Sequence, residues 1–169
     1  MKLKKILFTS MAVMALGAST AMAAPINQMA NNETAIGVGT KETYVEHKFA
    51  HKATVGFQYM DRDEYGDQKA AYMQYDVVGS EVKLIGGYRW DMGSNEKSNA
   101  YGGVALSTPK VLGFDLYSSY VAGRDFNEVQ VGLNKDIIAN VGLNVNYHNF
   151  KPKHGDRENA VGVGLTVKF

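Results

Sequence analysis

The sequence predicts an all-β protein, an antiparallel up-and-down transmembrane β-barrel with ten strands, or eight as the alternative. Three observations predict it. Apolar and polar or small residues alternate with period two through most of the chain. The connections between these runs fall into two classes that alternate along the chain, and aromatic residues gather toward the ends of the runs. Together they indicate a sheet with one apolar face and one polar face.

The N-terminus has the three-part pattern of a secretory signal peptide. Three lysines within the first five residues precede a mostly apolar run, residues 6–16, and Ala21-Met22-Ala23 follows as a small-residue cleavage site. The apolar run is shorter than the roughly 20 residues that a membrane-spanning helix needs. We therefore expect residues 1–23 to be cleaved, residues 24–32 to form a short periplasmic segment, and residues 33–169 to form the barrel.

Composition excludes several classes of partner. Without residues 1–23, the chain has 15 basic and 17 acidic residues, so it has no basic excess for binding nucleic acid. It contains no cysteine, which rules out a disulfide framework and a thiolate metal site. The length fits one domain.

The alternation is clearest in the last run of the chain. Small or polar residues separate five apolar ones: Val161, Val163, Leu165, Val167 and Phe169. Such a run predicts a strand with one lipid-facing side. Similar runs occur at residues 53–60, 71–77, 81–91, 98–107, 114–120, 129–134 and 141–148. In the run 98–107 the pattern places Val104 and Leu106 outward, with Gly103 and Ala105 inward.

The strand count depends on residues 33–49. Ile36 and Val38 occupy even positions, whereas Thr43, Val45 and Phe49 occupy odd ones. A tight turn near Lys41-Glu42 explains this change of phase and gives ten strands, whereas a β-bulge gives nine runs. Bacterial single-chain barrels have even strand numbers. We therefore predict ten strands, with eight if this first segment packs differently.

The connections predict the orientation of the barrel. Four are short and lightly charged: residues 50–52, 78–80, 108–112 and 136–140. Four are more polar or charged: residues 62–68, 92–97, 123–127 and 151–158. We expect the first class to be periplasmic turns and the second to be external loops. This orientation places aromatic girdles at the outer level (Tyr59, Tyr88, Trp90, Tyr101, Tyr120, Tyr147) and the inner level (Phe49, Phe114, Phe169).

A soluble β-sandwich or a periplasmic lipocalin-like barrel would also show alternation. A soluble barrel, however, packs apolar side chains inside. The face rich in Gly, Asn and Gln, the sorted aromatics and the final Phe169 favour the membrane barrel.

The alternating run that ends in Phe169 resembles the C-terminal strand of outer-membrane barrel proteins. The resemblance implies that Val161, Val163, Leu165, Val167 and Phe169 form the signal that the barrel-assembly machinery reads. The chain resembles small outer-membrane barrels of the OmpX-like, OmpA transmembrane-domain-like and YfaZ-like families. It departs from OmpX-type proteins by lacking long protruding hairpins, and from full-length OmpA by lacking a peptidoglycan-binding domain after the barrel, so adhesion and wall anchoring do not carry over.

Charged residues on the predicted inner face form a hypothetical lumen network: Asp76, Glu81, Lys83, Arg89, Asp91, Asp115 and Lys168. Unpaired charges in a narrow lumen are costly, so we expect them to pair. We predict a structural or surface-interaction role with a largely filled lumen. The alternative is a narrow polar pore for ions or small solutes.

An enzyme is not predicted. Acyl transfer needs a hydroxyl nucleophile beside a base, yet His148 has no hydroxyl two positions on, and Ser118 and Ser119 have no histidine in phase. A lipid-modifying enzyme is therefore the least favoured reading. His47 and His51 flank a turn and do not make a metal site. We expect no cofactor and no nucleic acid, a monomer in the bacterial outer membrane, and contacts with membrane lipid and lipopolysaccharide.

Overall fold

A computed structural model describes residues 26–40, 42–62, 65–92 and 98–169, so the predicted signal peptide lies outside the described residues. The described chain forms ten strands: β1 (Thr34–Gly39), β2 (Glu42–Ala50), β3 (Ala53–Arg62), β4 (Gly66–Val78), β5 (Val82–Trp90), β6 (Ser98–Ser107), β7 (Phe114–Gly123), β8 (Phe126–Ile138), β9 (Val141–Pro152) and β10 (Glu158–Lys168). No helix in the described part of the chain is long and apolar enough to cross a membrane.

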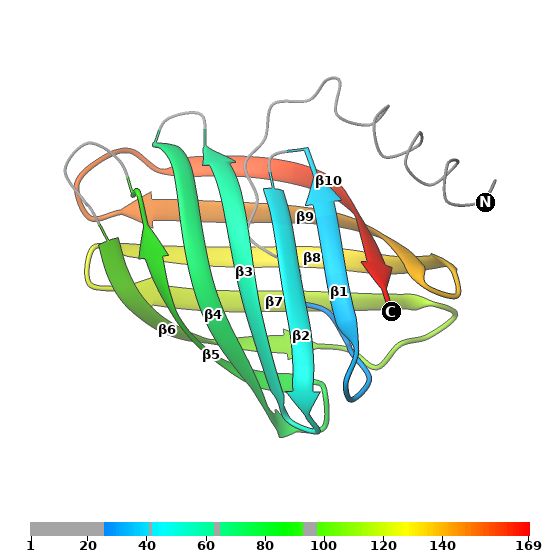
Figure 1. Ribbon diagram of the computed structural model, residues 1–169. Helices are drawn as coiled ribbons and strands as arrows, with labels where there is room; N and C mark the ends of the chain where they lie inside the picture. Colours follow the sequence, from blue (N-terminus) through cyan, green and yellow to red (C-terminus); the bar gives the residue numbers. More distant parts are fainter. Residues whose placement is uncertain (1–25, 41, 63–64, 93–97) are drawn as a thin grey trace.

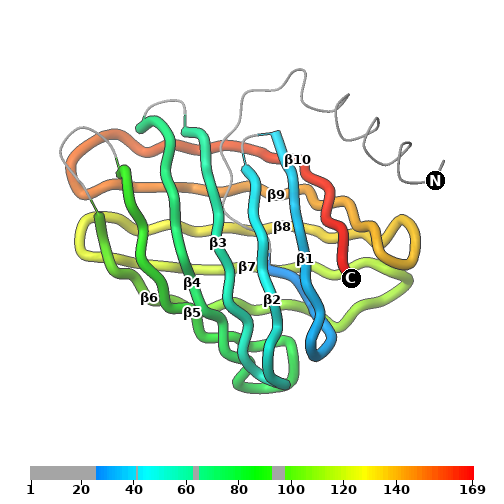
Figure 2. Tube along the Cα trace, in the orientation of Figure 1, coloured from blue at the N-terminus to red at the C-terminus, as the bar shows by residue number. Residues whose placement is uncertain are grey.

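The strands close into an antiparallel up-and-down barrel. Each strand pairs with its neighbours in sequence, and β1 also pairs with β10 (Figures 1 and 2). The prediction of ten strands is therefore confirmed. β1 and β2 pair with each other, Ile36 lying opposite Val45, so the change of phase comes from a chain reversal between them. Lys41, where the turn was predicted, lies outside the described residues.

The connections separate the barrel into two ends. The turn end contains the four connections β2–β3, β4–β5, β6–β7 and β8–β9, together with Thr34 and Phe169, which exchange two backbone hydrogen bonds. The loop end contains the other five connections. Several strands extend further toward the loop end than predicted, since Arg62, Gln68, Lys151 and Glu158 lie in strands. Each β-strand residue adds about 3.3 Å, so these extensions lengthen the wall.

Burial shows which face of the wall is apolar. Aliphatic and aromatic side chains cover the outside, with Leu84 51 % and Leu116 55 % exposed. Charged and amide side chains fill the inside, with Arg62 and Lys83 each 1 % exposed. Arginine and lysine are almost never fully buried in soluble proteins unless they are paired. This inversion is the arrangement expected of a barrel with lipid around it.

One girdle residue was placed on the wrong face. Tyr101 is 9 % exposed and points into the barrel. It shares the phase of Ala105, which is fully buried, so the alternation within β6 decides its direction. The remaining outer aromatics are exposed on the outside near the loop end: Tyr59, Tyr88, Trp90, Tyr120 and Tyr147. Phe49, Phe114 and Phe169 are exposed at the turn end.

Four tyrosines inside the barrel each lie against a glycine on the neighbouring strand. The pairs are directly opposite each other in the register: Gly37–Tyr44, Gly56–Tyr72, Gly87–Tyr101 and Gly132–Tyr117. A Cβ atom at any of these glycines would overlap the tyrosine ring. The missing side chain therefore lets each ring lie flat across the boundary between two strands.

Candidate functional site

The barrel lumen contains most of the buried charge of the protein, and its loop-end half is organised around one carboxylate. Glu128 on β8 accepts hydrogen bonds through Oε2 from Arg62 Nη2 at 3.1 Å and Arg89 Nη1 at 2.8 Å. The three side chains are at most 2 % exposed. Two buried cations on β3 and β5 thus share one anion from the far wall, and we call this set the arginine cluster.

Two phenylalanines pack against the arginine cluster. The guanidinium of Arg62 lies 4.1 Å from the ring centre of Phe150, and that of Arg89 lies 4.5 Å from the ring centre of Phe126. The two rings contact each other with centres 5.7 Å apart. Cations over aromatic faces are stabilised further when they are shielded from water. We call Arg62, Arg89, Glu128, Phe126 and Phe150 together the outer seal, because they occupy the loop-end half of the lumen.

The turn-end half contains a second charge cluster. Asp76 on β4 accepts hydrogen bonds from Lys48 Nζ at 2.7 Å and from Lys83 Nζ at 2.5 Å. All three side chains are at most 7 % exposed. The geometry mirrors the arginine cluster, with one carboxylate between two cations. Nearby, Asp115 accepts a hydrogen bond from Asn134 at 2.8 Å.

Residues 26–29, which precede β1, lie in this turn-end half. Ile26 is 3 % exposed and packs against Ala105 and Tyr117. Asn27 is 5 % exposed and donates a hydrogen bond to Glu46 at 2.5 Å. Within the predicted periplasmic segment 24–32, residues 26–29 are therefore held by lumen groups, whereas residues 30–32 are exposed and residues 24–25 lie outside the described residues.

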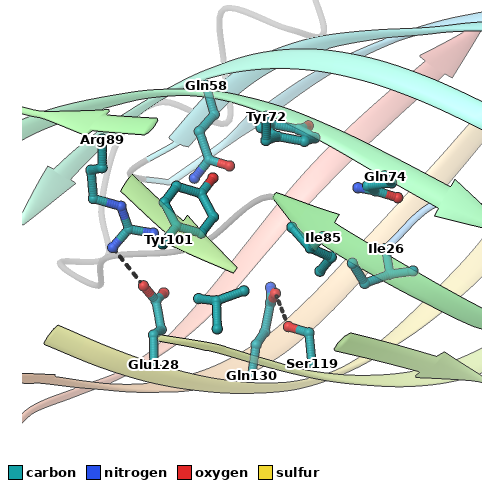
Figure 3. Close-up of a pocket in the computed structure, with 11 residues that line it drawn as sticks. Ile26, Gln58, Tyr72, Gln74, Ile85, Arg89, Tyr101, Ser119, Glu128 and Gln130 are labelled. Carbon is teal, nitrogen blue, oxygen red and sulfur yellow. Dashed lines mark hydrogen bonds and ion pairs between the residues drawn. The ribbon is translucent and has the colours of Figure 1, made fainter. Parts of the chain in front are cut away.

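A cavity of about 40 Å³ remains between the two halves (Figure 3). Ile26 borders it on the turn-end side, and Arg89 and Glu128 border it on the loop-end side. A water molecule needs about 10–15 Å³ of such space. This cavity therefore has room for a few waters at most.

The structure brings only part of the predicted charge network together. Asp76, Lys83, Arg89 and Asp115 are buried in the lumen. Lys168 is partly buried at the turn end, where it donates a hydrogen bond to the backbone oxygen of Gln28 at 2.8 Å.

Two members of the predicted network lie elsewhere. Glu81 lies in the turn between β4 and β5, one residue before β5 begins. Asp91 follows the last residue of β5 and forms an exposed ion pair with Lys69 at 3.2 Å. Both were assigned to the lumen by extending the alternation of β5 past its ends.

Several lumen charges were missed by the sequence analysis: Glu42, Glu46, Lys48, Arg62, Glu128 and Glu158. Arg62 and Glu158 were assigned to loops because polar residues at the end of a run resemble a connection. Strict continuation of the alternation from Gln58 and Met60 would have placed Arg62 inward. Among the described residues, no group of three or more His, Asp or Glu could hold a metal ion.

Fold and lumen together define the class: an antiparallel up-and-down transmembrane β-barrel with an apolar outer wall and buried charged and amide side chains in its lumen. No family model matches the sequence, and no curated protein matches it. The predicted membership in OmpX-like, OmpA-like or YfaZ-like families therefore stays a prediction.

Solved structures similar to this chain are other β-barrels. The KdgM porin has 8 % sequence identity, and the match covers 81 % of this chain and 98 % of that one with a TM-score of 0.47. A designed transmembrane β-barrel has 13 % identity, coverages of 85 % and 100 %, and a TM-score of 0.41. Neisserial surface protein A has 14 % identity, coverages of 81 % and 94 %, and a TM-score of 0.34. At these values the likeness concerns the barrel architecture and supports no statement about activity.

Proposed function

We propose that this protein is a small bacterial outer-membrane barrel with a closed lumen and a structural or surface-interaction role. The observation that carries the proposal is the packing of the lumen by paired charges. Glu128 binds Arg62 and Arg89 across the loop-end half, and Asp76 binds Lys48 and Lys83 across the turn-end half. Barrels of this size characteristically fill their interior with side chains.

The outer wall supports a membrane location. Its exposed aliphatic residues form the surface that lipid tails require, and aromatic side chains flank it at both ends. Interfacial tyrosine and tryptophan side chains place their polar atoms among lipid headgroups. The predicted signal peptide and the final alternating strand agree with export and assembly in the outer membrane.

Single-channel recording tests the closed lumen. We expect purified protein, shown to be folded by heat-modifiable migration on a gel, to give no conductance steps in planar bilayers, because both charge clusters lie across the lumen. An open porin in the same bilayers provides the positive control. Reproducible steps from the folded protein would contradict the closed lumen and favour the narrow polar pore, whose support is the polar side chains within the mixed lining of the cavity, such as Gln58, Gln74 and Gln130.

The loop-end rim offers a surface for lipid phosphates. Arg124, Lys151 and Lys153 line a hollow beside the exposed ring of Tyr120. Arg124 and Lys151 are exposed and form no ion pair with an acidic residue in the described ranges. Cations just above an aromatic girdle lie at the depth of lipid headgroups. We therefore propose that this part of the rim contacts the phosphates of lipopolysaccharide.

Neutralising the rim should weaken lipopolysaccharide binding. Each basic residue near an anionic lipid surface contributes about 1 kcal/mol, so the double variant Arg124→Gln/Lys151→Gln should raise the Kd for lipid A roughly tenfold or more. Titration of detergent-solubilised protein with lipid A, followed by native mass spectrometry, measures this. Lys69→Gln is the matched control, because Lys69 is already paired with Asp91. Equal Kd values for all three proteins would rule out this surface.

A further inference from the structure

We propose that the turn-end half of the lumen is a peptide-binding site, and that residues 26–29 are its dissociable occupant. In this reading the segment is a plug that closes the lumen independently of the outer seal. The inference rests on the proposed closed barrel, but it adds a second, removable closure. We call residues 26–29 the plug.

Three backbone carbonyls of the plug accept hydrogen bonds from side chains of the barrel wall. Asn134 Nδ2 donates to Ile26 O at 3.0 Å, Lys168 Nζ to Gln28 O at 2.8 Å, and Lys48 Nζ to Met29 O at 3.2 Å. These donors come from β8, β10 and β2, so the plug is held from several directions. No strand includes the plug, and none of these bonds belongs to a β-ladder.

The plug's side chains add two kinds of contact. Asn27 Nδ2 donates to Glu46 and also to the Tyr44 hydroxyl at 3.0 Å. Ile26 fills the space beside Ala105 and Tyr117. Gln28 Nε2 donates to Thr108 O at 2.7 Å. The site thus combines an apolar contact with polar contacts to amide side chains, the mixed lining that suits an organic ligand such as a short peptide.

The barrel does not need the plug to close its wall or to balance its charges. β1 pairs directly with β10, and Asp76 already pairs with Lys48 and Lys83. The donors that bind the plug are polar, so water can hydrate them when the plug leaves. The apolar surface that the plug covers is limited to what its two apolar side chains, Ile26 and Met29, contact. These features make the plug separable from the fold.

The cavity lies between the plug and the outer seal, so the lumen would be closed at two separate levels. Ile26 borders the cavity on one side, and Arg89 with Glu128 borders it on the other (Figure 3). Removing the plug would open the cavity to the turn end while the outer seal stays in place. The opened site would be a vestibule with one mouth, and the protein would still not conduct.

Cysteine labelling tests this directly, because the protein contains no cysteine. Ala105→Cys places a thiol beside Ile26, and Ala70→Cys places one in the loop-end half; both alanines are 0 % exposed. Each is introduced into the complete chain and into a chain without residues 26–31. Folded protein in detergent is treated with a small charged methanethiosulfonate reagent, with denatured protein as the measure of full labelling.

We expect the deletion to speed labelling at position 105 at least tenfold, as for a site released by local opening, and to leave position 70 protected. A synthetic peptide of residues 24–32 should restore protection at position 105 in a concentration-dependent way. The same peptide with Ile26→Ser and Asn27→Ala should not. If the deleted chain does not fold, the complete chain with Ile26→Ala and Asn27→Ala should show the faster labelling instead.

Three outcomes would overturn the proposal. Position 105 staying protected in a folded chain without the plug would show that no site is vacated. Labelling that the peptide cannot suppress would show that the segment is a fixed part of the core. Labelling of both positions would show a single closure rather than two. None of these outcomes depends on conductance, so failure here is distinguishable from failure of the closed-lumen proposal.

Discussion

Replacing Glu128 with glutamine is expected to lower the free energy of unfolding by about 3–5 kcal/mol. The amide matches the carboxylate in size but has no charge, so Arg62 and Arg89 would remain buried without their shared anion. Glu158 lies 3.8 Å from Arg62 and offers only partial compensation. The change should therefore be among the most destabilising single substitutions in the barrel.

Urea unfolding of the protein in detergent, followed by the loss of heat-modifiable migration, measures the effect. Asp91→Asn is the matched control, because it removes the same charge from the exposed pair with Lys69. Exposed pairs contribute about 0–1 kcal/mol, so the control should unfold close to the unsubstituted protein. An unchanged midpoint for Glu128→Gln would mean that the arginine cluster contributes little to stability.

Replacing Gly56 with alanine is expected to cost about 1–3 kcal/mol of unfolding free energy, as overpacking does elsewhere. The added Cβ would overlap the ring of Tyr72, which lies directly opposite on β4. Displacing that ring would also disturb its 3.1 Å hydrogen bond to Glu46. The cost thus includes both packing and a buried polar contact.

A double-mutant cycle with Tyr72→Ala isolates the contact. Once the ring is gone, the alanine at position 56 has room, so its cost should shrink in the double variant. Gly86→Ala serves as the control, since a Cβ there meets no atom within 4 Å. If Gly56→Ala and Gly86→Ala shift the unfolding midpoint equally, the ring contact does not require glycine.

Most of the architecture was predictable because alternation is a local property. The eight runs from residue 53 onward correspond to β3–β10, and the phase change in residues 33–49 separates β1 from β2. The even strand numbers of closed bacterial barrels then favoured ten strands over nine. Tyr101 is an exception. Its place near a strand end suggested the outer aromatic girdle, but the phase that it shares with Ala105 directs it into the barrel.

The contents of the lumen were less predictable because they depend on contacts across the barrel. Arg62 and Glu128 are far apart in sequence and meet only after the four intervening strands, β4–β7, have formed the wall. No local pattern signals that pairing. Residues 26–29 have no periodicity at all, so nothing in the sequence distinguishes a segment inside the lumen from a linker outside it.

The pairing that closes the wall is as short as any in it. β1 meets β10 over residues 35–39 and 164–168 and meets β2 over equally few residues, whereas β8 and β9 pair along most of their lengths. Two further backbone bonds between Thr34 and Phe169 fasten this seam at the turn end. The other nine strand pairs join neighbours in sequence, but this one joins opposite ends of the sheet. If the barrel opens laterally into the bilayer, the opening should therefore begin between β1 and β10.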